Sequence, residues 1–133
     1  MRLRLDFESG QSVGPGKIAL LERIGVCGSL SQAARELGLS YRRAWLLLDD
    51  LNQLFKDPAA TTLVGGKKGG GAVLTALGRT LITDFHRIER AATAASRRRF
   101  AGLSAAVSTQ KERSPASRQR LSRPLRRATV KHR

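Results

Sequence analysis

Two adjacent arginines, Arg42 and Arg43, stand near the start of a predicted helix with the sequence YRRAWLLLDD. The planar guanidinium group of arginine donates parallel hydrogen bonds, and this geometry fits the acceptors of a guanine edge or the oxygens of a phosphate. If Ala44 faces the interior, a rotation of about 100° per residue turns Arg42 and Leu46 outward. Arg43 and Trp45 then flank this outward stripe. The pattern predicts a surface that reads DNA, and the alternative is a solvated helix face.

Other side chains of this helix qualify that prediction. Tyr41 can reach a phosphate through its hydroxyl group, or it can pack against the protein. Trp45 is expected to pack between the helix and the hairpin that follows, rather than to contact a base. Asp49 and Asp50 would repel the phosphate backbone, so only the first two turns of the helix should enter a DNA groove.

The segment that positions the arginines has the pattern of two helices joined at Gly38. Only glycine enters the left-handed C-cap conformation without a steric penalty, so Gly38 should end the first helix. Ser40 is a good N-cap for the second helix. Apolar residues three and four positions apart give the first helix one buried face, formed by Leu30, Ala33, Ala34 and Leu37. This is the pattern of a helix-turn-helix, whose second helix enters the major groove; the alternative is an ordinary helical hairpin.

A second basic feature lies in the glycine-rich segment 65–71, which contains Lys67 and Lys68. The flanking runs 61–64 and 72–74 favour β-structure, so we expect a hairpin with a basic tip. Small residues would let this tip approach DNA while the lysines contact phosphate or the minor groove, although it could also be an ordinary surface loop. A nucleotide-binding loop is excluded because no Gly-Lys-Ser/Thr sequence follows.

The remaining elements should support this motif. Alternating apolar and charged residues predict a strand over residues 3–7, which could add a third strand to the hairpin. Pro15 suits the first turn of a helix that runs to about Cys27. The second helix of the motif should extend from Tyr41 to about Phe55.

The last predicted helix covers residues 76–99, with Thr75 as its N-cap. Leu77 and Leu81 are expected to serve the domain core. The spacing of the apolar residues keeps one narrow seam over several turns, which is typical of a helix that pairs with another helix. We therefore expect self-association, with packing within the chain as the alternative. The predicted dimerisation residues are Leu81, Phe85, Ile88, Ala92 and Ala95.

Charge points to a polyanionic partner. The chain has 25 Lys and Arg against 10 Asp and Glu, a net charge of +15. Residues 1–100 carry 16 basic and 9 acidic side chains, and residues 101–133 carry 9 and 1. Nucleic acid is the first expectation, and an acidic membrane surface is a weaker one because the tail has no amphipathic face. The segment 101–133 has too few apolar residues to form a core and is predicted to be disordered.

Enzyme chemistry has little support in the sequence. Cys27 is the single cysteine, and His86 and His132 are isolated, so neither a metal site nor a nucleophilic triad is expected. No cofactor is predicted. The sequence has neither a membrane-spanning segment nor the hydrophobic centre of a signal peptide, so a cytoplasmic protein that is not an enzyme is expected.

The combined motifs resemble the N-terminal DNA-binding domain of the ModE family, the molybdate-responsive transcription regulators of bacteria. The resemblance rests on GSLSQAARELGLSYRRAWLLLDDLNQLF and GGKKGGGAVLTALGRTLI and covers roughly residues 3–100. The first stretch matches the family at Ser29, Ser31, Gln32, Ala33, Ala34, Ser40, Tyr41, Ala44 and Trp45. The glycine-rich stretch matches it at Gly65, Gly66, Gly69, Gly70, Gly71, Ala72, Leu74 and Thr75. The related LysR-type regulators share the two-helix core and the pattern Leu74, Thr75, Gly78.

The resemblance implies a winged helix-turn-helix, mainly α with a small β-sheet and a long C-terminal helix. The expected organisation is a DNA-binding domain over residues 1–100, with a dimerisation helix at 76–99, followed by a basic tail at 101–133. The expected partners are double-stranded DNA and a second copy of the chain. The expected DNA contacts are Ser31, Gln32, Ser40, Tyr41, Arg42, Arg43, Trp45, Leu46, Lys67 and Lys68.

Two expectations concern how far the resemblance extends. Molybdate-sensing ModE proteins carry C-terminal oxyanion-binding domains, whereas this chain has only the basic segment there, so direct molybdate binding is not expected. The predicted function is a sequence-specific transcription regulator. The alternative is a nucleoid-associated or RNA-binding protein that coats polyanions by charge alone, and a salt titration would separate the two.

Overall fold

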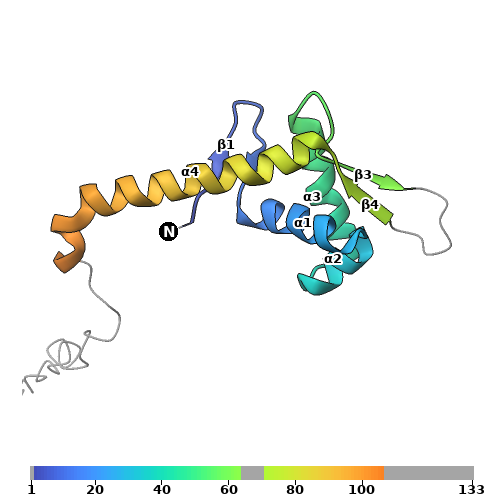
Figure 1. Ribbon diagram of the computed structural model, residues 1–133, viewed down its shortest axis with the longest axis horizontal. Helices are drawn as coiled ribbons and strands as arrows, with labels where there is room; N and C mark the ends of the chain where they lie inside the picture. The colour runs from blue at the N-terminus through green and yellow to red at the C-terminus, as the bar shows by residue number, and fades with distance from the viewer. Residues whose placement is uncertain (1, 64–70, 107–133) are drawn as a thin grey trace, which may run out of the picture. The chain divides into compact units, whose positions relative to one another are not determined.

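The computed structural model describes residues 2–63 and 71–106 (Figure 1). The chain divides into two compact units, Met1–Arg98 and Arg99–Arg133. The described elements are β1 (Leu5–Asp6), β2 (Ser12–Val13), α1 (Pro15–Cys27), α2 (Leu30–Glu36), α3 (Tyr41–Leu54), β3 (Ala60–Leu63), β4 (Gly71–Leu74), α4 (Ala76–Phe100) and the short 3₁₀ helix η1 (Ala101–Ala106).

The helix-turn-helix forms for the local reasons that the sequence indicated. The Ser29 hydroxyl accepts a hydrogen bond from the backbone N–H of Gln32 and caps α2. Gly38 has a φ of 67°, the left-handed conformation that allows the chain to leave α2. The Ser40 hydroxyl then accepts from the backbone N–H of Arg43 at 3.1 Å and caps α3. The predicted turn and both helix starts are confirmed.

The core of the first unit lies where α1, α2, α3 and the β3–β4 hairpin meet. Each helix contributes an apolar stripe, and the hairpin contributes small residues that allow close packing. The largest fully buried side chains are Phe85, Ile18, Leu20, Leu21, Ile24, Leu30, Leu51 and Val13. Because α3 buries only one side, its other side is free to present residues to solvent.

The two strands of the predicted hairpin are confirmed as β3 and β4, while its glycine-rich tip lies outside the described residues. They pair antiparallel, with Ala60 opposite Leu74 and Leu63 opposite Gly71. The chain just before α2 adds a short third edge, because Ser29 forms a β-bridge with Gly71. The hairpin is therefore held beside the helix-turn-helix, in the position of a wing.

The expectation that the N-terminal strand could join this hairpin is wrong. Strand β1 pairs antiparallel with β2 instead, and these two strands form a separate sheet. The reason is a tight turn: Gly10 has a φ of 86°, and the backbone N–H of Phe7 donates to the carbonyl of Gln11 at 2.9 Å. This turn folds the chain back on itself before it can reach the wing.

Helix α4 follows the wing directly, and Thr75 caps it as predicted. The Thr75 hydroxyl accepts from the backbone N–H of Gly78 at 3.1 Å. In Figure 1, α4 leaves the wing and runs past α1 and the N-terminal hairpin. Phe85 anchors α4 to the core, since its side chain is only 2% exposed.

Candidate nucleic-acid interface

The first turn of α3 presents two arginines to solvent. Arg42 and Arg43 are both exposed, whereas Ala44, the next residue of the helix, is fully buried. Within residues 2–63 and 71–106 neither guanidinium group has an ion-pair partner. The inward position of Ala44 and the outward position of Arg42 are therefore as the sequence predicted, and both arginines can receive an external acceptor.

The two acidic residues of α3 are held by neighbours of their own. Gln53 Nε2 donates to Asp49 Oδ2 at 2.8 Å. Lys17 Nζ lies 3.9 Å from Asp50 Oδ2, and it also donates to the carbonyl of Ser12 at 2.7 Å. These partners offset part of the repulsion that the carboxylates would exert on an approaching phosphate. The cationic first turn of α3 is thus followed by an acidic turn in which Asp50 has a cation nearby and Asp49 has a neutral hydrogen-bond donor.

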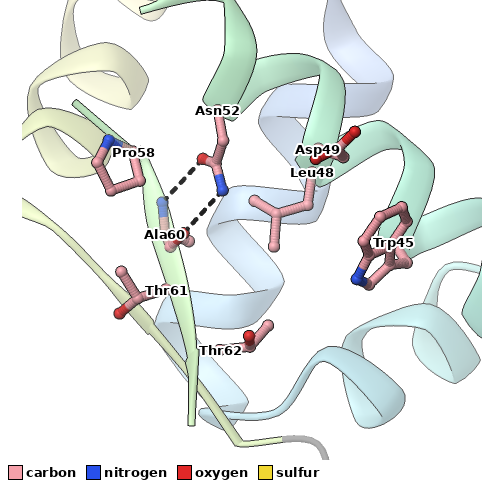
Figure 2. Close-up of a pocket in the computed structure, with 8 residues that line it drawn as sticks. All are labelled: Trp45, Leu48, Asp49, Asn52, Pro58, Ala60, Thr61 and Thr62. Carbon is pink, nitrogen blue, oxygen red and sulfur yellow. Dashed lines mark hydrogen bonds between the residues drawn. The ribbon is translucent and has the colours of Figure 1, made fainter. Parts of the chain in front are cut away.

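Three large side chains accompany the arginines on α3. Tyr41 is 51% exposed, Trp45 46% and Leu46 40%. Trp45 borders a shallow groove of about 390 Å³ between α3 and β3, which Thr61 and Thr62 line on the other side (Figure 2). Trp45 therefore borders the groove between the helix and the hairpin, and nearly half of its surface stays open to a ligand.

Asn52 ties α3 to the base of the wing, a role that sequence reasoning missed. Its Oδ1 accepts from the backbone N–H of Ala59 at 2.9 Å and of Ala60 at 3.5 Å. Its Nδ2 donates to the carbonyl of Ala60 at 3.0 Å (Figure 2). In the sequence, Asn52 appears only as one polar residue of an amphipathic helix. This does not identify the groups to which its amide binds.

Two predicted contacts lie on α2, where Ser31 and Gln32 are half-buried. The Gln32 side chain is already engaged: Arg35 Nη2 donates to its Oε1 at 2.7 Å, and its Nε2 donates to Glu36 Oε1 at 3.2 Å. Arg23 Nη1 lies 3.5 Å from Glu36 and extends the network to α1. The Gln32 amide has a second N–H, which could donate to a phosphate without breaking either of these hydrogen bonds.

The predicted basic wing tip completes the list of expected DNA contacts. Lys67 and Lys68 lie outside the described residues. The strands that carry them end at Leu63 and begin again at Gly71, beside the N-terminus of α2.

Helix α4 divides the predicted dimerisation residues into two groups. Phe85 is buried in the core of its own chain, and Leu81 packs against that core. The prediction that Phe85 pairs with a second copy is therefore wrong for this residue, because its side chain is 2% exposed and belongs to the core of its own chain. Ile88 is 43% exposed, Ala95 is exposed and Ala92 is half-buried, so these three stay accessible.

A histidine links α4 to α1. His86 Nε2 lies 2.5 Å from Glu22 Oε1, and His86 Nδ1 lies 3.5 Å from Glu89 Oε1. The hydrogen bond to Glu22 raises the pKa of His86 above its ordinary value of 6.5, and Glu89 adds to this, while burial acts in the opposite direction. The sequence showed His86 as isolated because its main partner is distant along the chain.

Other chemistries find no site in the described part of the chain. Residues 2–63 and 71–106 contain no cluster of three or more histidine, cysteine, aspartate or glutamate side chains that could hold a metal ion. None of their helices is long and apolar enough to cross a membrane.

Known proteins match this chain over the region that contains the interface. No family model matches. MopB of Rhodobacter capsulatus, a molybdenum-pterin-binding protein, is 48% identical over 81 residues, which are 61% of this chain and 30% of MopB. MopA of the same organism is 42% identical over 93 residues, which are 70% of this chain and 35% of MopA. The DNA-binding transcriptional dual regulator ModE of Escherichia coli K12 is 41% identical over 80 residues, which are 60% of this chain and 30% of that regulator.

A solved structure gives the fold independently. The DNA-binding domain of CbnR, crystallised as a DNA complex, superposes with a TM-score of 0.51 at 19% identity, covering 66% of this chain and 95% of that domain. The chain spans about a third of the length of the curated relatives it matches. Its homologues are therefore the ModE, MopA and MopB proteins, and the fold that it shares with CbnR is a winged helix-turn-helix with a long C-terminal helix.

Proposed function

We propose that this chain is a sequence-specific, DNA-binding transcription regulator of the ModE N-terminal type, acting in the cytoplasm as a homodimer. Its relatives include a DNA-binding regulator, and its fold is that of a domain solved on DNA. In this proposal Arg42 and Arg43 choose bases in the major groove, while hydroxyl groups and the wing set the position on the backbone.

The observation that carries the proposal is the exposure of the two arginines in the first turn of α3. Arg42 and Arg43 are exposed and have no ion-pair partner among the described residues, while Asp49 and Asp50 further along α3 are held by Gln53 and Lys17. An exposed arginine pair at the start of a helix that buries its other side is the arrangement that direct reading of guanine requires.

The dimer part of the proposal rests on α4. Ile88, Ala92 and Ala95 form an accessible strip beside the buried Phe85, and a second copy could cover this strip. Pairing through α4 would present two recognition helices to half-sites about one helical turn apart.

A selection of bound sequences from random duplexes, followed by competition with unrelated DNA, tests the proposal. Arg42→Ala should cost about 1–3 kcal/mol on the selected site and relax the base preference there, because a bidentate contact is lost. Arg4→Ala is the matched control, since Arg4 is an exposed arginine of the N-terminal hairpin, which packs at the opposite end of α3 through Phe7 and Phe55.

Equal losses on selected and random DNA would make Arg42 a phosphate contact. If the selection yields no preferred sequence, the chain is instead a polyanion-coating protein, the reading that its net charge of +15 also allows. We further propose that DNA binding by this chain needs no molybdate, because the region that matches the relatives is the region that has the fold of a DNA-binding domain. Added molybdate should then leave the affinity for the selected site unchanged.

A further inference from the structure

Helix α4 carries a second basic surface that the recognition helix does not explain. Its buried side is marked by Gly78 and Phe85, with Ile82 partly buried between them. At about 100° per residue these three point in nearly one direction. The opposite side of the helix is exposed, and it contains the arginine face, which we define as Arg79, Arg87, Arg90, Arg97 and Arg98.

The arginine face contains no acidic residue. Its five members fall within an arc of about 100° around the helix axis, and the other residues of that arc are small or hydroxylated: Ala76, Thr80, Thr83 and Ala94. Asp84 lies just beyond one edge of the arc, and Glu89 faces His86 on the buried side. The positive charge is therefore concentrated on one side of α4.

The charges on this face are mostly uncompensated. Within the described residues, no ion pair reaches any of the five arginines. Arg79 donates to the carbonyl of Leu74 at 3.3 Å, which holds its guanidinium group at the base of the wing. Arg90 and Arg97 border a shallow depression of about 450 Å³ over Ala94, which Thr93 and the acidic Glu89 also line, so a phosphate backbone would approach it from the Arg90 and Arg97 side.

We propose that the arginine face binds the phosphate backbone of duplex DNA outside the segment that α3 reads. This inference rests on the proposed function. From Arg79 to Arg98 the face is about 28 Å long, at a rise of ~1.5 Å per residue, and duplex DNA carries one negative charge per ~1.7 Å of its axis. A straight row of cations of this length can contact several successive phosphates.

The composition of the face favours nucleic acid over an acidic protein. Protein interfaces are organised around apolar or aromatic anchors that fill pockets. The arginine face has none, since Ile88 lies outside its arc and Phe85 is buried. Charge without an apolar centre suits a contact that is independent of sequence. The dimer strip formed by Ile88, Ala92 and Ala95 is centred roughly 140° around the helix from the centre of the arginine face. Ala95 and Arg98 are the nearest members, about 60° apart, so dimerisation would leave most of the arginine face open.

The test uses the full chain and two duplexes that carry the same selected site, one of about two helical turns (~20 bp) and one of about five (~50 bp). The variant Arg90→Gln/Arg97→Gln removes two charges with little change in helix propensity. On the long duplex it should bind at least about 10-fold more weakly at moderate salt, and its salt-dependence slope should be shallower by about 2 for each subunit whose arginine face contacts the duplex. On the short duplex it should match the wild type.

The matched control is Arg2→Gln/Lys56→Gln, which removes two exposed charges that have no ion pair among the described residues and lie away from α4 in sequence; it should leave binding to both duplexes unaffected. Arg90→Lys/Arg97→Lys should retain the slope on the long duplex, because the charge is kept. Equal losses on both duplexes, or an equal loss in the control, would overturn the inference. A loss of poly-glutamate binding with unchanged DNA slopes would also overturn it and would assign the face to an acidic protein.

Failure of the proposed function would look different. In that case the wild type would show no preference between the selected site and a ~50 bp duplex of unrelated sequence, whatever the length dependence. The affinity of the arginine-face variant is measured on both long duplexes, the one with the selected site and the one of unrelated sequence. Sequence preference and length dependence are thereby measured separately. Sedimentation of the same variant checks the dimer: dissociation would place the arginine face at the subunit interface and contradict the inference.

Discussion

Gly78 lies so close to Ala59 that a Cβ on Gly78 would stand 2.0 Å from the Ala59 carbonyl oxygen. The same oxygen accepts hydrogen bonds from the backbone N–H and the hydroxyl of Thr75, both at 3.0 Å. The N–H of Ala59 in turn donates to Asn52 of α3. One residue at the base of the wing therefore joins α3 to the start of α4, and the contact leaves no space for a side chain.

Replacing Gly78 should be costly because the obstacle is backbone rather than a flexible side chain. We expect Gly78→Ala to lower the free energy of unfolding by about 2–3 kcal/mol, since α4 must shift away from Ala59. Urea denaturation followed by circular dichroism measures this. Gly16→Ala is the control: that position in α1 has nothing within 4 Å, so the substitution should be neutral or slightly stabilising. Equal stability of the two variants would refute the close contact.

The hydrogen bonds of Asn52 should make its side chain contribute more to the free energy of unfolding than that of the next residue, Gln53. Asn52→Ala leaves the N–H of Ala59 and the carbonyl of Ala60 without their side-chain partners, and we expect a loss of about 1–3 kcal/mol in unfolding free energy. Gln53→Ala removes only an exposed contact with Asp49 and should stay within ~0.5 kcal/mol of the wild type. Thermal unfolding of both variants tests the difference, and a comparable loss in Gln53→Ala would argue against the role of Asn52.

The link between His86 and Glu22 should make stability depend on pH. Because the pKa of His86 is raised in the folded state, the protonated imidazole stabilises the fold fully below its unfolded value of 6.5. This stabilisation is lost as the pH rises through the higher folded pKa. The difference in unfolding free energy between wild type and His86→Gln should therefore shrink from pH 6 to pH 8, as expected from titration of a histidine.

Two comparisons sharpen the pH experiment. Glu22→Gln keeps the histidine but removes its main partner, so it should show a weaker pH dependence than the wild type. Apart from these substitutions the three proteins have the same sequence, so the differences report on the His86–Glu22 pair. A difference between wild type and His86→Gln that is constant or grows with pH would contradict the assignment.

The exposed part of the α4 seam should control assembly without controlling folding. Ile88→Glu places a charge on the strip that a second copy would cover. We therefore expect the dimer dissociation constant to rise by at least about 10-fold in sedimentation equilibrium. The thermal unfolding midpoint at low protein concentration should not change. Val26→Glu is the control, since Val26 of α1 is 73% exposed and lies outside the strip. An unchanged dimer in Ile88→Glu would leave the seam without a role in pairing.

Local rules were sufficient to predict the helix-turn-helix. Ser29, Gly38 and Ser40 act through caps and a left-handed turn, and these depend on neighbouring residues only. Periodicity also predicted which side of α3 is buried, because Ala44 and Leu48 repeat at the spacing of a helical turn. The two strands of the wing followed from β-prone residues on either side of a glycine run.

Contacts between distant parts of the chain could not be predicted in this way. Whether Phe85 faces a partner or its own core depends on the angle at which α4 crosses α1, and periodicity gives the face of a helix but not what covers it. The N-terminal strand has the same limitation: its alternation predicts pairing, while the turn at Gly10 decides that the partner is β2.

The sequence by itself determined the motif, its cationic residues and the resemblance to a family of regulators, because these depend on residue type and local spacing. Only the tertiary structure decided that Asn52 and Ala59 connect α3 to the wing, that His86 meets Glu22, and that five arginines share the open side of α4. The physical reason is that such contacts are fixed by the packing of whole elements against a common core, which no short stretch of residues specifies.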